Sequence, residues 1–312
     1  MLKRFYFDLL RKRKEKFPKL LSIELSSFCN AKCIMCPHSE ITRRKQHMHL
    51  ELLEKITDDC KDKPLKKINL FWFGDSLCNK QVIECFRIVR KNLPKVRLYL
   101  STNAGLLSEK RSKEIIDEKL LDVINFDIDG INKETYEKIR LQLNYDIVLK
   151  NVLFFLDYKK MKRLSKPQTR VTIIKMVPTK DEISQFVRYW KPLVDSVDIN
   201  AYNTWLGTKE DRNIGEEKNR SERGKFDFAC IHPWDELVIS ADGTAGLCCL
   251  DYDLKAPLGT LTVNSIEDIW TSQEINKYRR KMLKLNYDEI EVCRNCNAYL
   301  YQANKTWAKL QR

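Results

Sequence analysis

Seven of the eleven cysteines fall into two sets whose spacing suits a metal centre. The first set, C-x3-C-x2-C, lies in the stretch SSFCNAKCIMCPHS and comprises Cys29, Cys33 and Cys36. Three thiolates can bind one face of a cubane iron–sulfur cluster and leave its fourth position open for a substrate or cofactor. A structural zinc ion would need a fourth ligand, which His38 could supply. The first set therefore predicts an open iron–sulfur site or a closed zinc loop.

The second set supplies four cysteines, enough to close a metal site. Cys230 and Cys248 are joined by the spacing C-x12-G-x4-C, and Cys293 and Cys296 follow as C-x2-C. Four thiolates hold a cubane cluster or the zinc of a ribbon. The first twenty residues lack the apolar core and cleavage site of a secretory signal. We therefore expect a reducing, cytoplasmic setting, in which clustered cysteines more often ligate metal than form disulfides.

The elements that must position these cysteines alternate between strand and helix. A strand expected at 20–26 leads directly into the first cysteine set. About six βα repeats fit before residue 205, which predicts a parallel sheet. Six repeats are fewer than a closed barrel needs, so we expect a partial (β/α)6 TIM-like barrel or a doubly wound sheet, with ligands at the carboxyl ends of the strands. Further strands are expected at 65–75, 95–105, 121–130, 168–178 and 194–202.

This combination of a C-x3-C-x2-C loop and βα repeats resembles the radical S-adenosylmethionine (SAM) superfamily. The resemblance implies a [4Fe–4S] cluster held by Cys29, Cys33 and Cys36, with SAM chelating the fourth iron. It also implies an electron donor such as flavodoxin or ferredoxin, and cleavage of SAM to a 5′-deoxyadenosyl radical that abstracts a hydrogen atom from substrate. The cofactor performs this chemistry and the protein positions it.

Several other segments resemble the SAM-binding segments of that superfamily. Its Gly-Gly-Glu-Pro motif reads FGDS here, with a shorter carboxylate and no proline, and the usual aromatic residue before the third cysteine is a methionine. Arg140 could give the SAM carboxylate a bidentate fork, or be an ordinary surface arginine. The SAM contacts that the resemblance implies are Met35, Gly74, Asp75, Ser76, Ser101, Thr102, Asn103, Asp127 and Arg140.

The second cysteine set resembles the opening and middle of the SPASM auxiliary-cluster domain. A full SPASM domain has seven cysteines and two auxiliary clusters, but no cysteine follows Cys296. The resemblance therefore implies the shorter "twitch" form, a hairpin plus helices, with one auxiliary [4Fe–4S] cluster. The expected domains are a basic N-terminal helix at 1–19, the core at 20–205, a charged linker at 206–227 and the auxiliary-cluster domain with its tail at 228–312.

Cys249 adjoins a cysteine of the second set and is the candidate for a catalytic thiol. A thiol has a weak S–H bond and can return a hydrogen atom to a carbon radical, as in some radical SAM epimerases. Cys249 could equally be a buried structural thiol or an alternative cluster ligand. The resemblance thus leaves open oxidation, with an electron passing to the auxiliary cluster, or epimerisation. We expect a small carbohydrate- or cyclitol-like substrate, or a peptide.

The formal charge of +14 admits two other interpretations. It would suit a radical SAM enzyme that modifies RNA, but we find no RNA-binding motif and expect no nucleic-acid partner. The altered FGDS motif would suit an iron–sulfur scaffold without turnover. The first twenty residues carry a net charge of +6 and an apolar helix face, which we expect to pack on the body or to touch a membrane surface weakly. No apolar stretch is long enough to span a bilayer.

Overall fold

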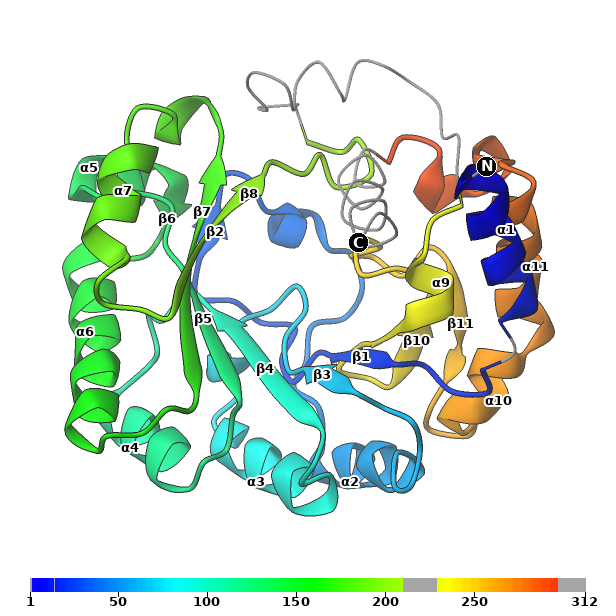
Figure 1. Cartoon of the computed structure of the whole chain (residues 1–312), viewed down its shortest axis with the longest axis horizontal. Helices are drawn as coiled ribbons and strands as arrows, with labels where there is room; N and C mark the ends of the chain where they lie inside the picture. The colour runs from blue at the N-terminus through cyan, green and yellow to red at the C-terminus, as the bar shows by residue number, and fades with distance from the viewer. Residues whose placement is uncertain (1, 14, 210–228, 297–312) are drawn as a thin grey trace.

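A computed structural model describes residues 2–13, 15–209 and 229–296. Six parallel strands form a curved sheet that resembles an opened barrel (Figure 1). This confirms the expected partial (β/α)6 barrel. Its strands are β1 (Leu20–Ile23), β3 (Lys67–Asn69), β4 (Arg97–Thr102), β5 (Val123–Asp127), β7 (Gln168–Lys175) and β8 (Ser196–Ala201).

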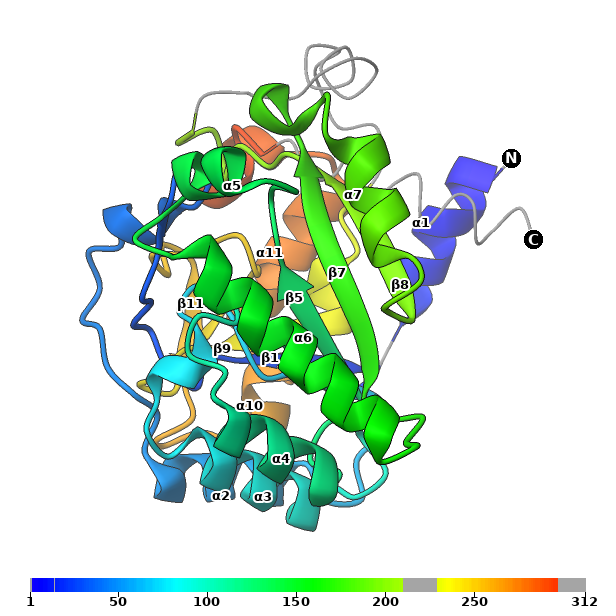
Figure 2. The same ribbon diagram turned by 90° about the vertical axis from the view of Figure 1, so that its left-hand side faces the viewer.

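Helices cover the outer face of this sheet, and α4 and α6 lie side by side outside it (Figure 2). Two of the helix starts expected from sequence are present, since Ser108 accepts a hydrogen bond from the Arg111 amide and Asn132 accepts one from the Thr135 amide. The helices of this layer are α2 (Leu50–Asp59), α3 (Val82–Asn92), α4 (Glu109–Asp117), α5 (Lys133–Ile139), α6 (Tyr145–Met161) and α7 (Ile183–Trp190).

Alternate residues of the strands point to opposite faces of the sheet. The outward positions are apolar and pack under the helices, as Leu21, Ile68 and Phe126 do in the main hydrophobic core. The inward positions are largely polar. They include Ser22, Asn69, Tyr99, Ser101, Asn125, Asp127, Arg170 and Thr172. The sheet thus separates an apolar outer layer from a polar interior.

The C-terminal segment extends the same sheet instead of forming a separate one. Its strand β9 (Glu236–Ile239) pairs parallel to β1, and the antiparallel strands β10 (Thr244–Gly246) and β11 (Pro257–Thr260) follow. The expected turn after β9 is present, with Gly243 at a φ of +89° that favours glycine. The helices of this segment are α9 (His232–Asp235), α10 (Ile266–Thr271) and α11 (Gln273–Leu283).

Short elements complete the fold around the cysteines. Strand β2 (Lys32–Cys33) pairs antiparallel with β6 (Arg140–Leu141). The 3-10 helices are η1 (Pro37–Glu40), η2 (Ser76–Cys78), η3 (Val177–Thr179), η4 (Tyr287–Glu289) and η5 (Glu291–Cys293).

The basic N-terminal helix α1 (Leu2–Lys12) packs on the C-terminal segment. Tyr6 and Leu10 are buried, and the Tyr6 hydroxyl donates to the carbonyl of Ala229 at 2.7 Å. Among the described helices, none has the length and apolar character needed to cross a membrane. Most of the expected linker, and the tail beyond residue 296, lie outside the described residues.

Candidate active site

The first three cysteines converge at the carboxyl end of β1. The Cys36 amide donates to the Cys33 carbonyl at 3.0 Å, and the pairing of β2 with β6 sets Cys33 opposite Arg140. Burial, together with a smaller effect of neighbouring thiols of the set, raises the pKa of Cys29 and of Cys36 to about 12. Three partly buried thiols within electrostatic reach of one another ionise readily when they bind a metal cation. The set therefore fits a metal centre.

The Gly74 loop packs tightly against the backbone that leads into the cysteines. A Cβ at Gly74 would lie 1.9 Å from the carbonyl oxygen of Ser26 and 2.7 Å from that of Phe28. The Asp75 amide also donates to the Phe28 carbonyl at 2.9 Å. Glycine is required here because no side chain fits between the two loops.

The carboxylate of Asp75 is engaged by the protein itself. Its oxygens accept hydrogen bonds from the Leu77 amide at 2.9 Å, the Thr102 hydroxyl at 2.8 Å and the Asn103 amide at 2.9 Å. The Ser76 hydroxyl donates to the Leu70 carbonyl at 2.6 Å. Asp75 thus joins the loops after β3 and β4, and Ser76 fixes the first of these loops to the end of β3; the sequence indicated neither role.

The Ser-Thr-Asn stretch after β4 divides between different neighbours. Ser101 points into the barrel and donates to Asp127 at 2.8 Å. Thr102 turns toward Asp75. The Asn103 side-chain amide donates to Asn30 at 2.9 Å and lies 3.8 Å from the Cys29 sulfur. Asn103 is therefore the member that reaches the first cysteine set.

Arg140 lies buried beside the cysteines, not on a helix surface. Its Nε and Nη2 donate to Asp129 at 3.0 and 2.6 Å, while Nη1 lies 3.8 Å from the Cys33 sulfur. Asp129, which the sequence analysis did not single out, also accepts the Ile174 amide at 2.7 Å. This ion pair places a positive charge beside Cys33.

Two groups near Arg140 are poised to receive a ligand. Burial raises the pKa of Asp127 to about 6, although Arg140 and Ser101 oppose the shift. The hydroxyl of Tyr136 is fully buried and has no hydrogen-bond partner among the described residues. The charges of Arg140, Cys33 and Asp127 are near enough to shift the pKa of Tyr136, which places the hydroxyl within electrostatic reach of them. Because buried polar groups are normally paired, this hydroxyl fits a site that receives a polar cofactor or substrate.

Met35 packs in an apolar cluster beside Cys33. The other buried members of this cluster are Ile139, Met176 and Tyr202. Its carbonyl accepts the indole N–H of Trp205 at 2.6 Å. The backbone expected to meet adenine is thus held by a residue just after β8.

The second cysteine set also converges. Burial raises the pKa of Cys293, and the thiols of Cys248, Cys230 and Cys296 raise it further. The Cys230 amide donates to the Tyr287 hydroxyl at 2.8 Å, and the Cys296 amide to the Cys293 carbonyl at 3.1 Å. Four thiols gathered from 230 to 296 can close a tetrahedral site or hold a cubane.

Cys249 contacts the Cys248 thiol and also belongs to a network of polar contacts that sequence reasoning missed. Its sulfur lies 3.9 Å from His232 Nε2, and His232 Nδ1 lies 2.9 Å from Glu236. Glu236 accepts the Ser22 hydroxyl at 2.5 Å, and Asn69 donates to Ser22 at 2.9 Å. A sulfur, an imidazole and a carboxylate within 4.8 Å of one another could bind a cation. The only sequence signal was a histidine four residues before a glutamate.

A second chain of polar contacts crosses the barrel interior between β4, β5 and β7. Asn125 donates to the Ser101 hydroxyl at 2.9 Å and to Asp127 at 2.7 Å, and it accepts the Thr172 hydroxyl at 2.7 Å. These two networks of polar contacts line the barrel interior with hydroxyl, amide and carboxylate groups, which we call the inner wall. The first cysteine set lies above this wall, at the carboxyl ends of the strands.

Comparison with protein families identifies the chain. Residues 23–185 match the model of the radical SAM superfamily, and residues 230–297 match the SPASM model, described as an iron–sulfur cluster-binding domain. The chain belongs to the radical SAM superfamily. Its cofactors are accordingly SAM, a [4Fe–4S] cluster and auxiliary iron–sulfur centres, and the family favours iron over zinc for both cysteine sets.

One curated relative matches along nearly its whole length, and two solved structures share the fold. The S-adenosyl-L-methionine-dependent 2-deoxy-scyllo-inosamine dehydrogenase of Niallia circulans is 18% identical over 299 residues, which cover 94% of this chain and 98% of the relative. The crystal structure of BtrN in complex with AdoMet and 2-DOIA matches with a TM-score of 0.62 at 17% identity, over 91% of this chain and 94% of that one. Streptococcus suis SuiB bound to precursor peptide SuiA matches with a TM-score of 0.70 at 14% identity, over 88% and 70%.

Proposed function

We propose that this radical SAM enzyme oxidises a hydroxyl-bearing carbon of a small carbohydrate- or cyclitol-like substrate. The observation that carries the proposal is the polar inner wall of the barrel. A polyhydroxylated substrate presents donors and acceptors on every side, and Asn69, Ser101, Asn125 and Thr172 offer matching groups. The similarity to a cyclitol dehydrogenase along nearly the whole chain supports the same class.

When bound, SAM with its cluster supplies the radical that takes the hydrogen atom, and an auxiliary cluster supplies an acceptor for the second electron. We assign Cys29, Cys33 and Cys36 to the first cluster. We assign Cys230, Cys248, Cys293 and Cys296 to the auxiliary one. In both places thiols from one short loop, or from one folded segment, gather in a buried spot.

The remaining residues of the site orient and bind. Asn103 and Arg140 direct N–H groups toward Cys29 and Cys33, and such hydrogen bonds tune a cluster and shield it. Tyr136 offers its unpaired hydroxyl to the bound SAM, and Gly74 keeps the loop close to the cysteines. The Met35 carbonyl would meet the adenine if the Trp205 indole, which now donates to that carbonyl, moves away or shares it with the adenine. Asp75 and Thr102 hold the two loops together, and Ser76 fixes the first loop to the end of β3.

In this proposal Asp127 accepts the proton of a substrate hydroxyl bound in the barrel interior. Its carboxylate lies on the inner face at the end of β5, beside the hydroxyl of Ser101. With a pKa of about 6, it is ionised near neutral pH and still basic enough to draw a proton. Removal of a hydroxyl proton is what the oxidation of a carbinol requires after the carbon has lost its hydrogen atom.

Epimerisation is the second candidate because of the contact between Cys249 and His232. In that reaction the Cys249 thiol would return a hydrogen atom to the opposite face of the substrate carbon. Oxidation and epimerisation differ in mass. The test is to incubate the reconstituted enzyme, SAM and a reductant in deuterated water with a panel of cyclitols, aminocyclitols and sugars.

Oxidation predicts a product two mass units lighter, with no deuterium at the altered carbon and one 5′-deoxyadenosine per product. One deuterium at that carbon, with no loss of two mass units, would replace oxidation by epimerisation. Turnover of an added peptide alone would overturn the proposed substrate class.

A further inference from the structure

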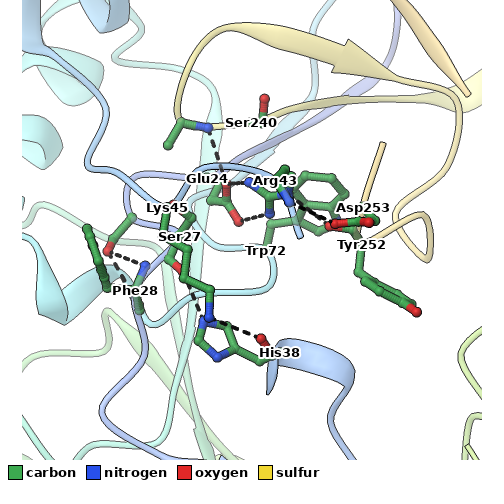
Figure 3. Close-up of polar contacts among 12 residues, drawn as sticks. Glu24, Ser27, Phe28, His38, Arg43, Lys45, Trp72, Ser240, Tyr252 and Asp253 are labelled. Atoms are coloured by element: carbon green, nitrogen blue, oxygen red, sulfur yellow. Dashed lines mark hydrogen bonds and ion pairs between the residues drawn. The ribbon is translucent and has the colours of Figure 1, made fainter. Parts of the chain in front are cut away.

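One guanidinium joins the loops that carry the two cysteine sets. Arg43 lies seven residues after Cys36, and it contacts the segments that follow β1, β3 and β10 at once (Figure 3). We propose that Arg43 is a positioning residue that fixes the auxiliary-cluster loop, residues 248–253, relative to the SAM-cluster loop. The inference rests on the proposed assignment of Cys248 as an auxiliary-cluster ligand.

The anchor of this junction is a buried ion pair at the end of β1. Arg43 Nη1 and Nη2 each donate at 2.7 Å to one of the two carboxylate oxygens of Glu24. The Glu24 side chain is fully buried, and the Ala241 amide also donates to it at 3.2 Å. A bidentate pair with both oxygens engaged fixes the plane of the guanidinium. Arg43 therefore has one orientation relative to the barrel.

The other contacts of this segment hold the auxiliary loop. Arg43 Nε donates to the Tyr252 carbonyl at 2.8 Å. The carboxylate of Asp253 accepts the Thr42 amide at 2.7 Å, the Thr42 hydroxyl at 2.6 Å and the Arg43 amide at 3.1 Å. The loop that begins at Cys248 is thus tied at Tyr252 and Asp253 to residues that follow the first cysteine set.

Trp72 completes the junction from the side of the SAM-binding loop. The Arg43 guanidinium lies 4.8 Å from the centre of its ring, and the indole N–H donates to the Cys249 carbonyl at 2.7 Å. Stacking on an aromatic ring is a contact that arginine makes well and that lysine cannot reproduce together with a bidentate pair. Trp72 is two residues before Gly74, so the junction also reaches the Gly74 loop.

The segment that carries Arg43 is itself fixed to the first cysteine set. His38 Nε2 lies 2.9 Å from the Ser27 carbonyl, Lys45 donates to the His38 carbonyl at 3.2 Å, and the Ser27 amide donates to the Gln46 carbonyl at 2.9 Å. These contacts leave little freedom between Cys36 and Arg43. A change at Arg43 should therefore free the auxiliary loop while the first cysteine loop stays in place.

The test compares Arg43→Lys with a matched control, Arg87→Lys. Arg87 also makes a bidentate pair, with Glu118 at 2.7 and 2.6 Å, but on the exposed outer helices. The first readout is amide hydrogen exchange of the apo chains. We expect peptides covering 248–254 to exchange about tenfold faster in Arg43→Lys, with peptides covering 29–36 and the control unchanged.

The second readout is the magnetic interaction between the two reduced clusters of the reconstituted enzyme, measured by pulsed electron paramagnetic resonance. Arg43→Lys should broaden or weaken this interaction while both clusters assemble. Product formed per 5′-deoxyadenosine should fall, because a misplacement of about 1 Å can cost a reaction about a hundredfold in rate. Asp253→Asn, which keeps the ion pair, should produce a smaller change in the same direction and remains informative if Arg43→Lys does not fold.

Unchanged exchange at 248–254 and an unchanged interaction in both Arg43→Lys and Asp253→Asn would overturn the inference. Equal changes in Arg87→Lys would overturn it too, because they would reflect general destabilisation. The proposed assignment fails separately. If a variant with both Cys248→Ala and Cys249→Ala retains all its iron, Cys248 is no ligand, and the exchange data on the apo chains still decide whether Arg43 fixes the loop.

Discussion

Replacing Asp127 by Asn should remove activity and yet make the apo chain more stable at pH 8. Burial raises the pKa of this carboxyl from its ordinary value of 3.8 to about 6. The folded chain therefore binds the proton more tightly than the unfolded chain does. The linked stability is fully present below pH 4 and is lost as the pH rises through about 6. At pH 8 the ionised group is a cost that asparagine does not carry.

The size of the effect follows from the shift. Two pKa units correspond to about 3 kcal/mol at about 1.4 kcal/mol per unit. The amide oxygen of an asparagine can still accept the Ser101 hydroxyl. The Asn125 side chain, however, would face an NH2 group instead of a carboxylate oxygen and would lose its hydrogen bond. Losing that hydrogen bond costs about 1 kcal/mol. The net gain in the free energy of unfolding at pH 8 should be about 1–2 kcal/mol.

Urea unfolding of the apo chains at pH 8 and at pH 4 measures this difference. Asp122→Asn is the matched control with the opposite sign, since Lys166 and Arg90 outweigh burial and hold the pKa of Asp122 at about 2. That control should be less stable at pH 8. A loss of stability in Asp127→Asn at pH 8, or an equal gain at both pH values, would refute the reasoning about the buried carboxylate.

Three further substitutions test other parts of the site. Gly74→Ala should weaken SAM binding and cost about 1–3 kcal/mol of stability, since its Cβ has no room; wild-type affinity for SAM in equilibrium dialysis would contradict this. Tyr136→Phe should stabilise the apo chain by about 1 kcal/mol in urea unfolding, because the buried hydroxyl is unpaired without a ligand, and it should lower SAM affinity. A loss of stability would mean that the hydroxyl already has a hydrogen-bond partner. Cys249→Ser should keep its full iron content and its yield of oxidised product, because oxidation needs no returned hydrogen atom; loss of product with intact clusters would assign the thiol a catalytic role.

Local patterns predicted the core of the fold. Alternating strands and helices indicated six parallel strands, and capping residues marked two helix starts. The spacing of cysteines indicated two metal centres, and the family models bear out the radical SAM and SPASM assignments. These features are readable because each depends on residues close together in the chain.

Contacts between distant residues were beyond such reasoning. β9 pairs with β1 across more than 200 positions, and the same pairing brings Glu236 to Ser22. Neither Arg43 nor Asp253 belongs to a sequence motif. Only the folded structure shows that the Arg43 amide donates to the Asp253 carboxylate. Asp75 was expected at SAM, but three donors from two loops already engage its carboxylate. Whether a polar side chain forms hydrogen bonds within the protein depends on three-dimensional packing. The spacing of residues in the sequence does not reveal this.

The most direct test of two distinct cluster sites is the iron and sulfide content per chain after anaerobic reconstitution. It should be measured together with 5′-deoxyadenosine formed from SAM under a reductant. The wild type should hold about eight irons and cleave SAM, whereas the Cys29, Cys33 and Cys36 to Ala variant should hold about four and cleave none. Zinc in place of iron, or a variant with unchanged iron that still cleaves SAM, would contradict the account.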